Sequence, residues 1–362
     1  MRKISKLWKS FLSRRCHILY ISVFTMDGFP LVSICIPTYN RAHMVNRAIE
    51  SALSQTYPNA EIIVVDDAST DSTYELVTSY HDPRMTYFKN PKNLGQFGNF
   101  NKCIDLSHGK YIHILHSDDY IDSNFTQICV EFLEANPNVA MTFTSAQLIY
   151  NGEQKRIAVS DHNIIYQAPE GFREILRSRS IIICPSVMIR KDVYNFVGFY
   201  SPEYPYSGDF YQWLRIAKRF DIAYVAGATL FYRQGSHSES YQLLFKTPLG
   251  YIDTIKIFVR VVNELGDELK LFSYELNCAY RRHMLDCLFA GIARSESMTK
   301  YSSLIFIGFA LSIWSMIIPL SVSDWIKKIG NFFLIGAVAF VIIVPSGRYV
   351  ARKIFRLDTK KY

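Results

Sequence analysis

The sequence LVSICIPTYNR at residues 31–41 is a short apolar, β-branched run that ends in a polar turn. The same pattern follows twice more, in IIVVDDASTD at residues 62–71 and in KYIHILHSDD at residues 110–119. Apolar runs without polar alternation are typical of strands that are buried on both faces of a parallel sheet. Ligands of such sheets bind beyond the carboxyl ends of the strands. We therefore expect the three polar turns to line one crevice.

Two of these turns are rich in carboxylates. Asp66 and Asp67 follow the second run, and Asp118 and Asp119 follow the third. Clustered carboxylates suit hard cations such as Mg²⁺ or Mn²⁺ and, through the cation, a phosphorylated ligand. The sequence therefore predicts a divalent-metal site at this edge of the sheet.

The segments between the strands have helical periodicity. Helices are expected at residues 41–56, 96–106, 123–135, 171–179, 208–220 and within 243–293. Strands are expected at residues 61–65, 85–88, 110–115, 139–145, 181–190 and 222–232. Residues 151–169 are polar and irregular, and they indicate no regular element. The alternation of strands and helices predicts an α/β fold whose sheet is parallel at least in its first half.

Length, charge and cysteine content narrow the class of protein. The 362 residues suffice for one large domain with an accessory region, and the net charge of +8 suits nucleic acid, anionic lipid or phosphorylated substrates. The seven cysteines are odd in number and form no Cys-x-x-Cys pair. This pattern indicates reduced thiols facing a cytosol, and it argues against both a disulfide scaffold and a zinc site.

Two long apolar stretches lie near the C-terminus. Residues 301–323 and 329–347 contain no charged side chain, and a membrane span needs about 20 such residues. Basic residues precede the first stretch and follow the second, which favours a hairpin with both ends in the cytoplasm. A buried helical pair in a soluble domain is the alternative. Basic residues beside apolar segments suit lipid headgroups better than nucleic acid, so we expect membrane lipids and no nucleic acid as partners.

The first 25 residues have a pattern of their own. Apolar residues recur there at helical spacing with basic residues between them. This pattern is typical of a basic amphipathic helix on an anionic membrane surface. A signal peptide and a disordered leader are the alternatives, and the first lacks a small-residue cleavage site.

The ordered set PTYNR, VDDASTD and HSDD resembles a family 2 glycosyltransferase with the GT-A fold. Residues 93–119 resemble the segment that leads into the Asp-x-Asp motif of that family, and the likeness extends over about residues 31–240. It implies a Rossmann-like, mostly parallel sheet flanked by helices, a nucleotide-diphosphate sugar donor and Mn²⁺ or Mg²⁺. The chain then has five expected parts: an amphipathic segment (1–29), the GT-A domain (30–240), a helical connector (241–300), two transmembrane helices (301–347) and a basic cytoplasmic tail (348–362).

The resemblance implies roles at the first two turns. Asp67 stands where the family places a carboxylate that reads the edge of the base, although Asp-Ala-Ser-Thr-Asp is also a good helix cap. The expected nucleotide-sugar-binding residues are Pro37, Thr38, Tyr39, Asn40, Arg41, Asp66, Asp67, Asn93, His116, Ser117 and Arg233.

The metal ligands implied by the resemblance are Asp118, Asp119 and His237. Asp118 matches the metal-binding Asp by position, whereas His116 replaces the leading Asp, which is often assigned to the ribose. The imidazole of His116 could hydrogen-bond a ribose hydroxyl or bind the cation. His237 comes late in a segment, residues 230–240, that resembles the family's Tyr-Arg-x-His region. The alternatives are that the two Asp residues cap a turn and that His237 is a surface residue.

The expected general base is Asp209. Many family members have Glu-Asp at this point, whereas this chain has Gly208-Asp209. A carboxylate here could accept the acceptor's proton, which implies inversion at the anomeric carbon. An N-cap role for Asp209 is the alternative.

These implications predict an inverting glycosyltransferase of bacterial O-antigen or capsule synthesis. It would add one sugar to a lipid-linked or polysaccharide acceptor, with its catalytic domain on the cytoplasmic face of the inner membrane. A polyprenyl-phosphate glycosyltransferase is the first alternative, and Asp209 argues mildly against it because a phosphate acceptor needs no strong base. A processive synthase is expected less, because Gln212-Trp213 lacks the Gln-x-x-Arg-Trp pattern. A non-catalytic scaffold with a degenerate transferase fold is motivated by His116 and Gly208.

Overall fold

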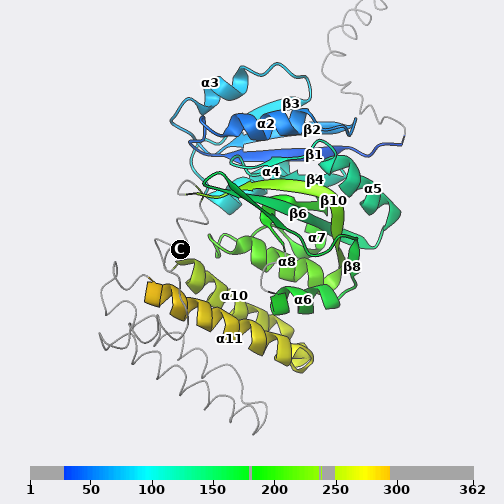
Figure 1. The fold of residues 1–362 in the computed structure, drawn as a ribbon, viewed down its shortest axis with the longest axis vertical. Coiled ribbons are helices and arrows are strands. Elements are labelled where there is room, and N and C mark those ends of the chain that lie inside the picture. Colours follow the sequence, from blue (N-terminus) through cyan, green and yellow to red (C-terminus); the bar gives the residue numbers. More distant parts are fainter. Residues whose placement is uncertain (1–27, 179–181, 236–237, 239–248, 294–362) are drawn as a thin grey trace, which may run out of the picture.

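The computed structural model describes residues 28–178, 182–235, 238 and 249–293 (Figure 1). The expected N-terminal amphipathic helix, the membrane hairpin at 301–347, the basic tail and His237 lie outside the described residues. Among the helices that are described, none is long and apolar enough to cross a bilayer.

The first half of the central sheet is parallel, which confirms the prediction. In spatial order its strands are β3 (Met85–Lys89), β2 (Ala60–Asp66), β1 (Val32–Thr38) and β4 (Tyr111–Ile114). The register pairs Thr38 with Asp66 and Cys35 with Ile114. The polar turns that follow β1, β2 and β4 therefore lie at the same edge of the sheet.

The second half of the sheet is mixed. Its strands continue in the order β9 (Val187–Arg190), β6 (Val139–Tyr150), β10 (Asp221–Arg233) and β5 (Tyr120–Ile121). β9 is antiparallel to both β4 and β6, whereas β6 and β10 are parallel. Because β9 runs the opposite way, the turn that precedes it reaches the edge where β4 ends.

Two short strands fall in the stretch where the sequence indicated no regular element. β7 (Glu153–Ile157) pairs with β6, and β8 (Ile164–Tyr166) pairs with β10. Every residue of β7 is exposed, so no apolar alternation marks it as a strand. The expectation that residues 151–169 are irregular was wrong. Backbone pairing with β6, rather than burial of apolar side chains, makes β7 a strand.

Helices cover both faces of the sheet (Figure 1). They are α2 (Val45–Leu53), α3 (Thr73–Thr78), α4 (Gln96–Leu106), α5 (Phe125–Ala135), α6 (Glu170–Ser178), α7 (Val193–Val197), α8 (Gly208–Arg219), α10 (Leu249–Leu265) and α11 (Leu269–Ala293), with 3₁₀ turns η1 (Cys184–Ser186) and η2 (Gly266–Glu268). Alternate residues of β1 point to opposite faces. Ile34 belongs to a core with α2 and α5, whereas Cys35 belongs to a core with α4, α6, α8, α10 and α11.

Candidate active site

The turns after β1 and β2 are interlocked by hydrogen bonds. The backbone N–H of Asn40 donates to Ser69 Oγ at 2.8 Å, and Asn40 Oδ1 accepts from the Thr70 N–H at 2.8 Å. The Ala42 N–H donates to Asp71 Oδ2 at 3.1 Å. Since these amides are bonded across the two turns, α2 begins at Val45 rather than at residue 41, where the sequence placed it. Asn40 therefore shapes the turn in which the sequence predicted a nucleotide contact.

The other predicted residues of the first turn differ in exposure. Pro37 and Thr38 are buried at the end of β1, and Thr38 Oγ1 has no hydrogen-bond partner among the described residues. Tyr39 is 46% exposed, and Arg41 is half-buried. The turn thus presents one exposed aromatic ring beside a guanidinium.

Asp66 and Asp67 have different surroundings. Asp66 is fully buried, and it accepts hydrogen bonds from the Ser69 N–H at 2.8 Å and from the Tyr87 hydroxyl at 2.6 Å. These bonds shape the turn and leave Asp66 a structural role. Asp67 lies next to it, directly after β2, where its backbone N–H donates to Thr38 O at 2.8 Å.

The carboxylate of Asp67 holds the loop before α4. Oδ1 accepts from Asn90 Nδ2 at 2.9 Å and from the Leu94 N–H at 2.8 Å, while Oδ2 accepts from the Gly95 N–H at 3.0 Å. Asn93, also predicted to bind the nucleotide, accepts from the same Gly95 N–H at 2.9 Å. Each carboxylate oxygen can accept two hydrogen bonds. With one bond from the described residues, Asp67 Oδ2 therefore keeps one acceptor position.

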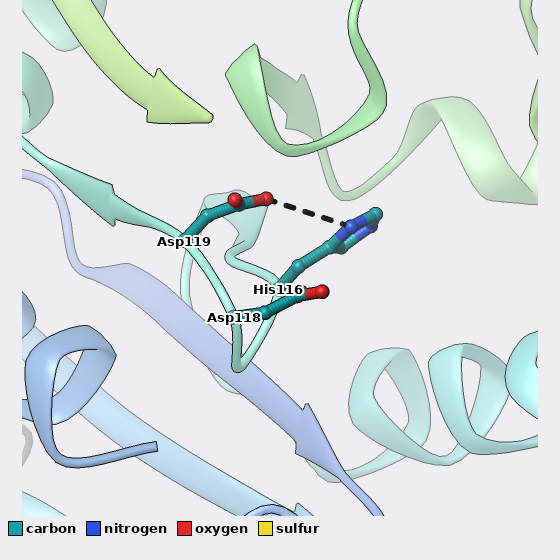
Figure 2. Close-up of side chains that lie close together, drawn as sticks. All are labelled: His116, Asp118 and Asp119. Atoms are coloured by element: carbon teal, nitrogen blue, oxygen red, sulfur yellow. Dashed lines mark ion pairs between the residues drawn. The ribbon is translucent and has the colours of Figure 1, made fainter. Parts of the chain in front are cut away.

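His116, Asp118 and Asp119 form a cluster in the loop after β4. One ligand atom of each lies within 4.8 Å of the others, and His116 Nδ1 is 3.9 Å from Asp119 Oδ2. Figure 2 shows the three side chains directed to the same side of the loop. Ser117 between them is buried. The structure thus groups His116 with the two predicted metal ligands.

A positive charge would stabilise the ionised form of the carboxylates in this cluster. Burial raises the pKa of Asp119 well above its usual value and Asp118 raises it further, while Arg233 and Arg41 oppose the shift. Burial lowers the pKa of His116. Asp119 Oδ2 and His116 Nε2 are buried without a partner among the described residues. Two carboxylates and a neutral imidazole with unbonded ligand atoms fit a divalent cation such as Mn²⁺ or Mg²⁺.

Arg233 at the end of β10 forms hydrogen bonds to the loop after β4 that carries Asp118 and Asp119. Its backbone N–H donates to Asp119 Oδ1 at 2.8 Å, and its guanidinium donates to the backbone carbonyl of Asp118 and to Met44 O, the latter at 3.2 Å. Burial lowers the pKa of Arg233. Arg233 was predicted to bind the nucleotide, and in the structure it orients a predicted metal ligand.

Asp209 lies in the first turn of α8. Its Oδ1 accepts from the Phe210 N–H at 2.8 Å, and burial raises its pKa to about 6. A carboxylate with a pKa near the working pH is suited to general base catalysis. The structure therefore supplies the electrostatic property that the predicted base requires.

Cys184 is a buried thiol that is influenced by both Asp209 and Asp119. Burial raises the pKa of its thiol, and the charges of Asp209 and Asp119 raise it further. Both carboxylates therefore lie close enough to act on one side chain. Cys184 begins η1, which is held by a 2.9 Å contact between His113 Nε2 and Pro185 O. The sequence marked Cys184-Pro185 only as an interruption of a strand.

Aromatic rings of α4 lie beside Gly208, which precedes the predicted base, and beside His116. A Cβ atom on Gly208 would lie 2.8 Å from the ring of Phe97, and the ring centroid of Phe100 is 5.5 Å from that of His116. Tyr200 stacks on Phe97 with centroids 5.4 Å apart. Gly208 therefore stands where the family often has Glu because the Phe97 ring fills the space beside it. The sequence alone held no signal for this contact.

A cavity of about 640 Å³ lies away from this site. Its lining includes Gly109 and Lys110 before β4, and Lys191 and Asp192 after β9. These residues lie at the opposite ends of the strands from the acidic loop, so the cavity is separate from the candidate active site.

The sheet order and the acidic loop after β4 define an α/β fold of the GT-A type. Residues 33–198 match the family model described as glycosyl transferase family 2. The chain therefore carries a family 2 glycosyltransferase domain, and the predicted family and enzyme class are confirmed.

Two similar proteins from Escherichia coli are named with one and the same activity. The chain is 29% identical over 198 residues to the UDP-Glc:alpha-D-GlcNAc-diphosphoundecaprenol beta-1,3-glucosyltransferase WfgD, a match that covers 55% of this chain and 74% of WfgD. It is 40% identical over 104 residues to WfaP, named with the same activity, which covers 29% of this chain and 41% of WfaP. The chain thus spans well under half of WfaP in that match.

A solved structure shows the same fold. The Staphylococcus aureus protein TarS, residues 1–349 in complex with UDP-GlcNAc, superposes with a TM-score of 0.61 and 18% sequence identity. The superposition covers 80% of this chain and 81% of that chain. It confirms the predicted α/β fold of the GT-A type.

Proposed function

We propose that the protein transfers glucose from UDP-glucose, with inversion, to a lipid-diphosphate-linked sugar in bacterial surface-polysaccharide synthesis. One observation carries the proposal: ligand atoms of His116, Asp118 and Asp119 lie within 4.8 Å of one another in the loop after β4 of a family 2 glycosyltransferase domain. The named activities of WfgD and WfaP support the donor and the acceptor.

The acceptor capacity of Asp67 supports a uracil base. One acceptor position remains on Oδ2, which matches the single imide N–H of uracil. Guanine presents an N–H and an adjacent amino group, which would need two acceptors side by side. The exposed ring of Tyr39 can pack against the base from the neighbouring turn. These features favour UDP-sugars over GDP-sugars.

The chain's own residues account for the acceptor side of the reaction. Asp209 takes the proton of the acceptor hydroxyl as the hydroxyl oxygen bonds to the anomeric carbon, and the bond to the diphosphate breaks on the opposite face. This displacement inverts the anomeric configuration. His116, Asp118 and Asp119 would hold Mn²⁺ or Mg²⁺, which supplies charge neutralisation for the departing diphosphate.

We further propose that residues 301–347 form a membrane hairpin with the catalytic domain at the cytoplasmic face of the inner membrane. The two charge-free stretches and their basic flanks support this placement. An undecaprenol-linked acceptor, as in the names of WfgD and WfaP, would also be found at a membrane.

Turnover by the membrane-extracted chain tests the function. UDP-glucose, UDP-GlcNAc and GDP-mannose would be supplied with GlcNAc-diphosphoundecaprenol, in Mn²⁺, in Mg²⁺ and in chelator. We expect metal-dependent transfer from UDP-glucose and a loss of about 10²-fold or more in both Asp118→Ala and Asp209→Asn. Asp192→Asn, at the opposite strand ends, is the matched control and should keep full activity.

The outcomes separate the alternatives. Turnover of no donor would favour the scaffold. Undecaprenyl phosphate would be offered as a second acceptor, and metal-dependent transfer to it that survives Asp209→Asn would indicate a phosphate acceptor, because a phosphate needs no base.

A further inference from the structure

The loop that leads into α8 is held by a helix that lies outside the sheet. Asp253 on α10 accepts a hydrogen bond from the Tyr206 N–H at 2.9 Å through Oδ2. Asp253 is only 2% exposed. Its cationic neighbour Lys256 lies 3.7 Å from Oδ1, on the other side of the carboxylate. A buried carboxylate on α10 thus binds a backbone amide three residues before the predicted base.

The N-cap residue of α8 provides no side-chain cap. Ser207 is the N-cap residue, but its side chain makes no capping bond to the helix. Its Oγ instead lies 3.4 Å from Gly250 O and 3.4 Å from Thr254 Oγ1, both on α10. The first amides of a helix need partners and carry a partial positive charge. Asp209 bonds one of these amides, that of Phe210, and Asp253 on α10 holds the Tyr206 N–H just before the N-cap.

The geometry of Asp209 depends on this loop. Its carboxylate bonds to the N–H of Phe210, within its own turn, so the backbone of the helix start sets its direction. The ring of Phe97 contacts Gly208 from one side, and α10 holds Tyr206 and Ser207 from the other. The base is thus fixed between α4 and α10.

We infer that Asp253 is a positioning residue for the general base: it holds the backbone at Tyr206 so that the Asp209 carboxylate faces the acceptor hydroxyl. The inference rests on the proposed function for the role of Asp209. Through Asp253, helix α10 would then help to position the general base. A shift of about 1 Å in a reacting group can cost about 10²-fold in rate, so the position of this loop matters.

Hydrogen exchange tests the structural half of the inference without any need for activity. In the full chain, Asp253→Ala should speed the exchange of amides in residues 204–210 while those of the last turns of α8 keep their protection. Asp253→Asn, which keeps one acceptor oxygen, should show a smaller change. Glu275→Gln is the matched control, since Glu275 is a buried carboxylate on α11 that contacts Arg173 and Arg177 instead. Unchanged exchange at residues 204–210 in Asp253→Ala would overturn the inference.

A double-mutant cycle tests the catalytic half. Asp253→Ala should lower kcat for transfer about 10²-fold with the KM for UDP-glucose unchanged, and Asp253→Asn should restore part of the loss. In the Asp209→Asn background, Asp253→Ala should change kcat less than about 2-fold, because the residue it positions is gone. An equal loss in both backgrounds would show that Asp253 does not act through Asp209. Wild-type protein without turnover would overturn the proposed function, and exchange would still decide whether Asp253 orders the loop.

Discussion

At the scale of single residues, burial sets the chemistry of the carboxylates. Asp66 is buried, and both of its oxygens are bonded to neighbours, so it shapes a turn. Asp119 is equally buried, but Oδ2 lacks a partner among the described residues. An ionised carboxylate is costly to bury without compensation. The same residue type thus serves as a turn former in one loop and as a candidate metal ligand in the next.

We expect Mn²⁺ to raise the thermal unfolding midpoint of the wild type but not that of Asp119→Asn. At a concentration of about 100 Kd the cation should stabilise the wild type by about 2.7 kcal/mol, because it binds only the folded state. The metal-free variant should be at least as stable as the metal-free wild type, since it no longer buries an uncompensated charge. Differential scanning fluorimetry with a Mn²⁺ titration measures both quantities.

Asp122→Asn is the control for this experiment. Asp122 is also partly buried, but it accepts backbone hydrogen bonds from Thr229 and Asn124. Its substitution should lower the metal-free midpoint and leave the shift caused by Mn²⁺ intact. A full Mn²⁺ shift in Asp119→Asn would exclude Asp119 as a ligand.

Transfer should depend on pH through Asp209. Burial raises its pKa to about 6, and the base acts in its ionised form, so kcat/KM should rise as pH increases through about 6. One pH unit below that value, about a tenth of the base remains ionised, and the rate should fall about 10-fold. A pH profile of transfer measures this limb, and Asp209→Asn should lack it. A wild-type profile flat from pH 5 to 7 would contradict the assignment.

At the scale of elements, α4 connects three parts of the site. The loop before it is held by Asp67, Phe97 contacts Gly208 at the start of α8, and Phe100 lies beside His116. The sequence predicted the bounds of α4 correctly from its apolar periodicity. It did not predict these contacts, because they join residues that are far apart in the chain.

Gly208→Ala should destabilise the protein by about 1–3 kcal/mol, because the added Cβ would lie 2.8 Å from the Phe97 ring. It should also lower kcat, since Asp209 follows directly. Gly250→Ala is the control: no atom lies within 4 Å of a Cβ there, and alanine should stabilise α10 by up to about 1 kcal/mol. Urea unfolding and transfer assays measure both effects. Phe97→Leu in the Gly208→Ala background should restore part of the stability, and no restoration would contradict the steric account.

At the scale of the whole molecule, two helices behind the sheet complete its second core. α10 and α11 lie side by side beyond α6 and α8 (Figure 1), and Phe272 of α11 packs edge-on against Phe172 of α6 at 4.9 Å. Glu275 of α11 accepts from Arg173 at 3.1 Å and from Arg177 at 2.9 Å, both on α6. The α10–α11 pair is thus fastened to the transferase fold by apolar packing and by a shared carboxylate.

Glu275→Gln should cost about 1–3 kcal/mol of unfolding free energy at neutral pH, because it weakens hydrogen bonds to two guanidinium groups. Burial acts to raise the pKa of Glu275, but a backbone hydrogen bond together with the hydrogen bonds and charge of the arginines lowers it overall. Its contribution to stability should therefore be present above the usual Glu pKa of about 4.3 and lost as pH falls through the lower folded value. Denaturant unfolding at pH 7 and at acid pH measures the difference between wild type and variant. A difference that does not shrink in acid would exclude the ion pairs as its cause.

The sequence by itself determined the parallel half of the sheet, the edge at which the polar turns meet, and most of the carboxylates of the site. These features follow from the local period of apolar residues and from the order of strands and helices along the chain. The tertiary structure alone decided the mixed half of the sheet and the parts of Cys184, Phe97 and Asp253. Asp253 and Tyr206 are 47 residues apart in the chain, so no local pattern marks their hydrogen bond. Such contacts arise only when separate elements pack, because burial and proximity rather than residue type then set the pKa, the orientation and the available partners of each side chain.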